Sequence, residues 1–191
     1  MHIDQFWNVI ESARTAAAGA GQPFDGALVD RLATCPKQDI LEYQEHFDDV
    51  HHAVYRWDVW AAAYLIGGGC SDDSFMDFRA GLISLGRDWY ERAAACPDRL
   101  ADHPAVVEAA SSHRDEALFY EEVNYAASEA FERITADGED FYEAWAGYRA
   151  TKVENKERDH DMGEDFDFDD AEEMYARLPR LAALYLGGRA A

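Results

Sequence analysis

The chain has 191 residues, and its thirty-nine acidic and seventeen basic residues give a formal net charge of −22 at pH 7. This length suits one domain with a substantial core, and we predict a single all-α domain over residues 1–191. So strong a negative charge repels nucleic-acid phosphates and argues against DNA or RNA binding. It fits either a basic protein partner or solubility alone, and the acidic excess is steeper after residue 100.

The cysteines point to a reducing compartment. Cys35, Cys70 and Cys96 are odd in number and widely spaced, which is typical of small buried thiols. The N-terminus lacks the basic and apolar regions of a signal peptide, and no apolar run reaches membrane-spanning length. We therefore expect a cytoplasmic protein without membrane contact.

The first hydrophobic runs predict two helices. Asp4 is placed to cap a helix that carries Phe6 and Trp7, and the small residues of 16–21 predict a linker after it. Residues 24–35 predict a short second helix, closed by a cysteine-proline pair.

A long central helix is predicted next. From Ile40 to Tyr64 the apolar residues recur every three or four positions, which is the period of one helix face. After Ala53 the opposite face becomes apolar too, as in a buried helix. We predict one helix that begins half exposed near Pro36, enters the core by Trp57, and continues to the glycines that follow.

Residues 67–73, Gly-Gly-Gly-Cys-Ser-Asp-Asp, are here called the glycine corner. Glycine readily adopts the left-handed conformation that ends a helix. Ser71 is a good N-cap for the next helix, and Asp72 and Asp73 suit the positive end of its macrodipole. The corner thus predicts a buried helical hairpin, around which an irregular bundle is built.

Further helices are predicted towards the C-terminus. They are expected over 87–96, from Pro104 onwards, over 116–136 and over 141–148.

The last part of the chain begins with a charged segment. We expect a mobile acidic loop at about 149–168, because it holds many charges and few apolar residues. Asp169 and Asp170 then begin a final helix that Pro179 kinks or divides. No alternation typical of strands is visible, so the fold class is all-α.

Several segments together resemble a known family. They are Phe6-Trp7, the run from Tyr55 to Ile66, Gly68 to Asp73, Phe78-Arg79, Leu82 to Ser84, Gly86-Arg87, Pro97-Asp98, Leu100-Ala101 and Leu178 to Leu181. On these residues the chain resembles a bacterial, largely actinobacterial, domain-of-unknown-function family numbered 4240. The chain has Gly81 where the family pattern tends to place tryptophan. The resemblance implies no assigned activity, so it supplies no catalytic residue.

The glycine corner is the best candidate site. The candidate ligand-binding residues are Arg56, Asp58, Cys70, Ser71, Asp72, Asp73 and Arg79. Asp72 and Asp73 could hold a divalent metal or act as acid and base, and Arg79 could bind an anion or pair with Asp72. Helix capping explains the same residue types without further assumptions, and we favour it.

Other motifs predict no metal or cofactor. The seven histidines include no H-E-x-x-H motif. Residues 159–165 are similar to a calcium loop, but with Gly163 in the glycine position Arg158, His160 and Met162 stand where acidic ligands belong. The acidic run from Asp165 to Asp170 could bind a divalent ion weakly, and we favour a solvated acidic loop instead. The triple glycine lacks the Gly-Lys-Ser/Thr of a phosphate loop.

Three functions remain open. The favoured hypothesis is a non-enzymatic cytoplasmic interaction or regulatory protein that binds a basic partner through its acidic C-terminal half. The alternative is a small enzyme or ligand-binding or metal-binding protein with its site at the glycine corner. A third, suggested by acidity alone, is an immunity-type or nucleic-acid-mimicking inhibitor. Salt-sensitive binding to a specific protein would support the interaction hypothesis. A cavity beside Asp72 and Asp73 would support the hypothesis of a site at the glycine corner.

Overall fold

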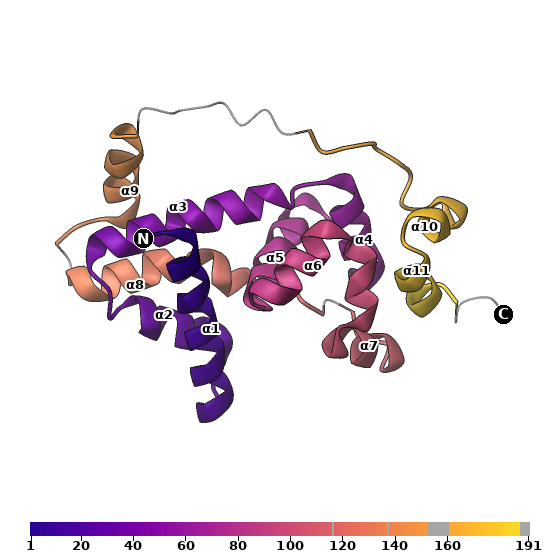
Figure 1. The fold of residues 1–191 in the computed structure, drawn as a ribbon, viewed down its shortest axis with the longest axis horizontal. Helices are drawn as coiled ribbons and strands as arrows, with labels where there is room; N and C mark the ends of the chain where they lie inside the picture. The colour runs from indigo at the N-terminus through magenta and orange to yellow at the C-terminus, as the bar shows by residue number, and fades with distance from the viewer. Residues whose placement is uncertain (116, 137, 153–160, 188–191) are drawn as a thin grey trace. The chain divides into compact units, whose positions relative to one another are not determined.

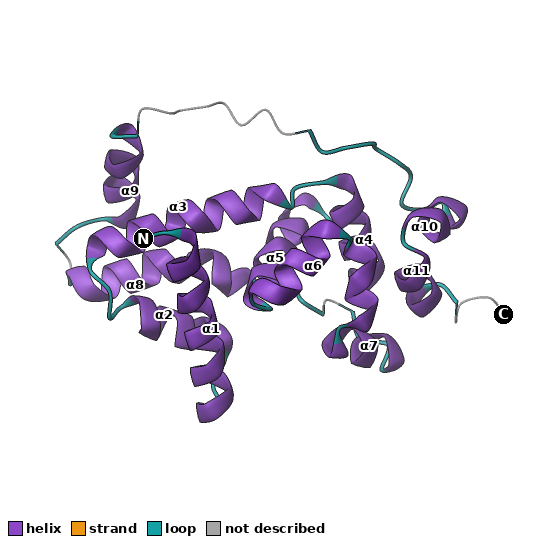
Figure 2. Cartoon of the chain, in the orientation of Figure 1, coloured by secondary structure: helices purple, strands orange, loops and turns teal. Residues whose placement is uncertain are grey.

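The computed structural model describes residues 1–115, 117–136, 138–152 and 161–187. These residues form helices and loops and no strand (Figure 2), which confirms the all-α prediction. The chain divides into two compact units. Met1–Val50 and Glu122–Asp159 form the first, and His51–Glu121 and His160–Ala191 form the second.

The first unit joins the N-terminal helices to a later segment of the chain (Figure 1). It contains α1 (Ile3–Ala20), α2 (Phe24–Leu32), most of α3 (Lys37–Ala53), α8 (Ala126–Thr135) and α9 (Phe141–Ala150). Its core includes fully buried Phe6, Tyr43 and Phe131. The rings of Phe6 and Tyr43 lie 5.0 Å apart, so aromatic packing ties α1 to α3.

Helix α1 differs from its prediction at both ends. It begins at Ile3, and the backbone N–H of His2 donates to Oε1 of Gln5 at 2.9 Å, whereas Asp4 lies within the first turn. The predicted linker over 16–21 is wrong, because the helix continues to Ala20. Alanine is the best helix former, and Gly21 ends the helix in the left-handed conformation at φ 64°.

The second unit contains the glycine corner. Its elements are α4 (Trp57–Gly67), α5 (Asp72–Ser84), α6 (Arg87–Ala95), a 3₁₀ helix η1 (Pro97–Asp102), α7 (Pro104–Ser111), α10 (Ala171–Arg177) and α11 (Pro179–Tyr185). Pro179 divides the final helix, as predicted. The division occurs because proline has no N–H to continue α10 but suits the first position of α11.

The predicted helix from Pro36 to the glycine corner is wrong, because it is interrupted at 54–56. Arg56 is extended at φ −139°, and α4 starts anew at Trp57. The backbone N–H of Trp57, which has no partner within its own helix, donates to the carbonyl of Met162 at 3.0 Å. The periodic pattern continues across the interruption, so periodicity alone did not reveal it.

The predicted helix over 116–136 is also wrong in its first half. Residue 116 lies outside the described residues, 117–120 form turn and loop, and a 3₁₀ helix η2 (Glu121–Tyr125) precedes α8. Leu118 has φ 73°, which a continuous helix excludes. A Cβ at Gly81 would overlap the Leu118 carbonyl oxygen, so the loop lies directly on α5. Gly81 is therefore required by this close approach.

A buried carboxylate attaches the C-terminal helix. Asp98, which is 7 % exposed, accepts hydrogen bonds at Oδ1 from the backbone N–H groups of Arg180 (3.0 Å) and Leu181 (2.9 Å). These groups begin α11, where a carboxylate is favoured by the helix dipole. The guanidinium of Arg180 also pairs with exposed Asp102. Two widely separated segments of the chain are joined in this way.

Candidate functional site

The glycine corner has the capping geometry that the sequence predicts. Gly68 ends α4 in the left-handed conformation at φ 64°, and its N–H donates to the Tyr64 carbonyl. Ser71 caps α5, because its Oγ accepts from the backbone N–H of Ser74 at 3.2 Å. Asp72 and Asp73 occupy the exposed first turn of α5. N-capping therefore accounts for Ser71, and the helix dipole of α5 accounts for the carboxylates of Asp72 and Asp73.

Arg56 and Asp58 form a pair with each other. Nε of Arg56 donates to Oδ1 of Asp58, and a terminal guanidinium nitrogen donates to Oδ2, both at 2.9 Å. This two-point geometry is the strongest that arginine and a carboxylate can form. The hydrogen bonds to Asp58 raise the pKa of Arg56. At the start of α4, the positive charge of Arg56 is therefore balanced by the negative charge of Asp58.

Aromatic rings connect α4 to α5. Trp57 and Trp60 stack at 5.4 Å, and Trp60 stacks on Phe75 at 4.7 Å. These two tryptophans are only half-buried, so the expectation that α4 is in the core from Trp57 is wrong; its core residues begin at Val59. The guanidinium of Arg79 lies 5.0 Å from the Phe75 ring centre and continues the stack.

Arg79 is held by backbone and histidine. It donates to the His51 carbonyl at 3.1 Å, and the same nitrogen lies 3.1 Å from Nδ1 of His51. Burial and the Arg79 charge lower the pKa of His51 to about 4, so this imidazole is neutral at pH 7. Burial lowers the pKa of Arg79 to about 10, which leaves it charged.

The Cys70 thiol is not activated. Burial raises its pKa to about 12, so the nucleophilic thiolate is scarce at neutral pH. The Cys70 carbonyl instead accepts from the indole N–H of Trp60 at 3.1 Å and holds the corner against α4. The seven candidate residues thus divide among three sets of contacts: the Arg56 pair, the Arg79 stack and the caps of the corner.

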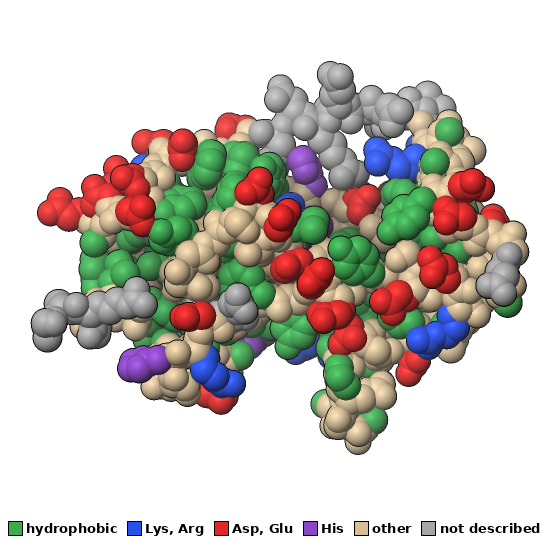
Figure 3. Space-filling model, turned by 180° about the vertical axis from the view of Figure 1, so that it is seen from behind, with side chains coloured by type: hydrophobic (Ala, Val, Ile, Leu, Met, Phe, Trp, Pro, Cys, Tyr) green, Lys and Arg blue, Asp and Glu red, His purple; other side chains and the backbone are tan. Residues whose placement is uncertain are grey.

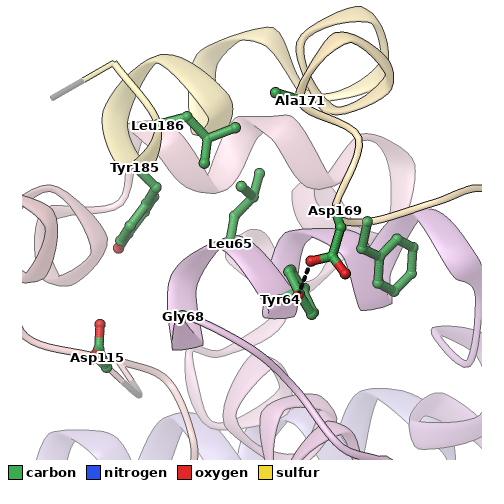
Figure 4. A pocket seen from close by; sticks show the side chains of 9 residues that line it. Tyr64, Leu65, Gly68, Asp115, Asp169, Ala171, Tyr185 and Leu186 are labelled. Carbon is green, nitrogen blue, oxygen red and sulfur yellow. Dashed lines mark hydrogen bonds between the residues drawn. The ribbon is translucent and has the colours of Figure 1, made fainter. Parts of the chain in front are cut away.

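A pocket of about 200 Å³ lies behind the glycine corner (Figure 4). We call it the acidic pocket, and its lining residues are Tyr64, Leu65, Gly68, Asp115, Phe168, Asp169, Ala171, Tyr185 and Leu186. Leu65 is buried, whereas Asp115 and Asp169 are exposed. Carboxylates therefore stand at the mouth of a partly apolar hollow, and no lining residue is basic.

Small residues bring the loop before η2 against the glycine corner. The loop over 117–120 crosses α5 at Gly81, and a Cβ at Gly67 would lie 2.9 Å from the Phe119 ring. A Cβ at Gly68 would lie 3.2 Å from a carboxylate oxygen of Asp115. The glycines thus leave room both for the loop and for the mouth of the pocket.

The opposite wall comes from 168–186. The hydroxyl of Tyr64 donates to Oδ1 of Asp169 at 2.5 Å, and the ring of Phe168 lies 5.5 Å from that of Tyr64. Tyr185 donates to the Val106 carbonyl at 3.2 Å. The hydrogen bond to Asp169 raises the pKa of Tyr64, and burial raises that of Tyr185 to about 12. Both phenols therefore stay protonated at pH 7.

No group of three or more His, Cys, Asp and Glu side chains in the described ranges is arranged to hold a metal ion. Asp159 and His160, which belong to the loop considered above for calcium, lie outside these ranges. No described helix is both long and apolar enough to cross a bilayer.

The fold and the pocket define an all-α protein with an acidic hollow built around a glycine corner. The model of the family described as Protein of unknown function (DUF4240) matches residues 1–133, and the chain belongs to this family. No curated protein and no solved structure matches the chain. The family match includes the glycine corner and Asp115, whereas Phe168 to Leu186 lie beyond it.

Sequence reasoning missed most of the pocket. None of the seven candidate residues lines the pocket, and Gly68 is the lining residue that belongs to the glycine corner. Asp115, Asp169 and Tyr185 come from segments far apart in sequence. The signal that could have drawn attention to the C-terminal wall is the pair Phe166 and Phe168 in an acidic segment. Aromatic residues at such positions need a surface to cover them.

Proposed function

We propose that this protein is a non-enzymatic interaction protein that binds a basic protein partner through carboxylates of its acidic surface. The observation that carries the proposal is the acidic pocket, where Asp115 and Asp169 stand at the mouth and no basic residue lines the wall. Carboxylates that lack basic neighbours attract a cation from outside the molecule.

The charge of the whole chain supports the same proposal. Red carboxylates are spread over the face shown in Figure 3, with fewer blue groups among them. A net charge of −22 produces a field that draws in basic partners and speeds their association. Because exposed charges are screened over about 10 Å at 0.1 M salt, such binding must weaken as salt rises.

Affinity capture from a lysate of the native host, at low and at high salt, tests the proposal. The expected result is one basic protein, retained in stoichiometric amount at low salt and released at high salt. The partner is then purified and its affinity for the chain is measured directly. Retention of no protein at low salt would contradict the proposal, as would a purified partner that does not bind.

A second candidate function is ligand binding at the glycine corner. The observation in its favour is that Gly68, a corner residue, lines the acidic pocket. Asp72 and Asp73 are exposed and are not among the lining residues. Replacing Asp72 and Asp73 by asparagine tests this candidate, because a ligand held by their carboxylates would be lost whereas one held by the pocket would be kept.

A further inference from the structure

We propose that the acidic pocket binds one arginine side chain of a partner protein. This inference rests on the proposed function and specifies its chemistry. The pocket combines three features that a guanidinium requires: aromatic faces for stacking, carboxylates for hydrogen bonding, and a volume that fits one side chain.

The volume of the pocket suits one side chain. About 200 Å³ corresponds to six or seven water molecules at roughly 30 Å³ each. Pockets for drug-sized ligands and cofactors are larger, at roughly 300–1,000 Å³. The hollow therefore has room for one long side chain.

The polar groups determine the charge of the occupant. Asp169 already accepts from the hydroxyl of Tyr64, which fixes the direction of its carboxylate and leaves its second oxygen available. Asp115 forms no ion pair with any basic side chain of the described residues. It lies across the pocket near Tyr185 in Figure 4. The second oxygen of Asp169 can thus receive a cation in the pocket, and Asp115 adds a second negative charge to the lining.

The aromatic walls favour arginine over lysine. Phe168 and Tyr64 both line the pocket, and their rings pack on each other at 5.5 Å with planes tilted by 55°. A planar guanidinium stacks on the face of such a ring, whereas an ammonium is a strongly hydrated point charge. The same unit shows this contact beside the pocket, where Arg177 lies 4.2 Å from the Phe166 ring centre. The Phe166 and Phe168 rings are 5.1 Å apart.

The test is a titration of the full chain with short acetylated peptides that carry one arginine, one lysine or one norleucine among glycines. Amide NMR signals report the site, and calorimetry reports the affinity. The arginine peptide is expected to shift the signals of Leu65, Gly68 and Ala171 and to bind more tightly than the lysine peptide. The norleucine peptide is expected not to bind.

Matched variants locate the site. The double variant Asp115→Asn with Asp169→Asn is expected to bind the arginine peptide about tenfold more weakly, since an exposed ion pair and a second negative charge of the lining are removed. Asparagine keeps an oxygen that accepts from Tyr64, so the fold is preserved, and thermal unfolding checks this. Asp72→Asn with Asp73→Asn makes the same change of charge outside the pocket and is expected to keep the affinity.

Three outcomes overturn the inference. They are no shift at the pocket signals, equal affinity for arginine and lysine peptides, and equal losses in the two double variants. Equal losses in the two double variants would still agree with the proposed function, because binding would then depend on the general acidic surface. Loss of partner capture with intact peptide binding would instead refute the proposed function alone.

Discussion

Asp98 offers a sharp test of how the C-terminal helix is attached. Its Oδ1 accepts from two backbone N–H groups at 3.0 and 2.9 Å, and the carboxylate is 7 % exposed. Asp98→Ala leaves both donors without this partner, and the Leu181 N–H is buried. A hydrogen bond to a charged group contributes about 1.5–3 kcal/mol, and loss of an N-cap costs about 0.5–2 kcal/mol. We therefore expect a loss of about 2–4 kcal/mol.

Chemical and thermal unfolding measure this effect. For a chain of this size, 1 kcal/mol corresponds to about 2–4 °C in Tm, so Asp98→Ala is expected to lower Tm by about 5–15 °C. Asp98→Asn keeps an accepting oxygen and loses less. Asp102→Ala is the matched control, because it removes only the exposed ion pair with Arg180. If Asp98→Ala and Asp102→Ala destabilise equally, the capping argument is wrong.

Four further predictions follow from other parts of the fold. Gly81→Ala is expected to destabilise by about 1–3 kcal/mol or more in urea unfolding, because the added methyl overlaps a backbone carbonyl; an unchanged midpoint would contradict this. Cys96 is exposed, so the expectation of a buried thiol is wrong there. Cys70 is expected to resist maleimide at neutral pH while Cys96 reacts, and mass spectrometry of the labelled peptides decides it. Because the folded pKa of His51 is about 4 and its unfolded pKa about 6.5, the unfolded state binds the extra proton between these values. Stability is thus expected to fall as pH drops from about 6.5 to 4, and to fall less in His51→Gln; identical pH profiles would refute the assignment. Finally, the single-domain prediction expects one calorimetric unfolding transition, and two separate transitions would oppose it.

Local chemistry was predictable from the sequence. The glycine corner and the Ser71 cap depend on residues adjacent in the chain, and both occur where predicted. The division at Pro179 likewise follows from the proline itself.

Features that depend on tertiary contacts were not predictable. The interruption before Trp57 is accompanied by a bond to Met162, and the loop at Leu118 depends on the absence of a side chain at Gly81. In both of these segments the apolar residues recur with the period of a helix, but contacts with a distant segment determine where the helix ends. The acidic pocket was missed for the same reason, since Asp115 and Asp169 come to line one pocket only in the fold.

Binding of a basic protein through the carboxylates of this chain is best tested by the salt dependence of its affinity for the captured partner. We expect a dissociation constant that rises steeply with ionic strength in the wild-type chain. We also expect a smaller rise after Asp115→Asn with Asp169→Asn. A partner that binds equally well at low and high salt would contradict the proposed function.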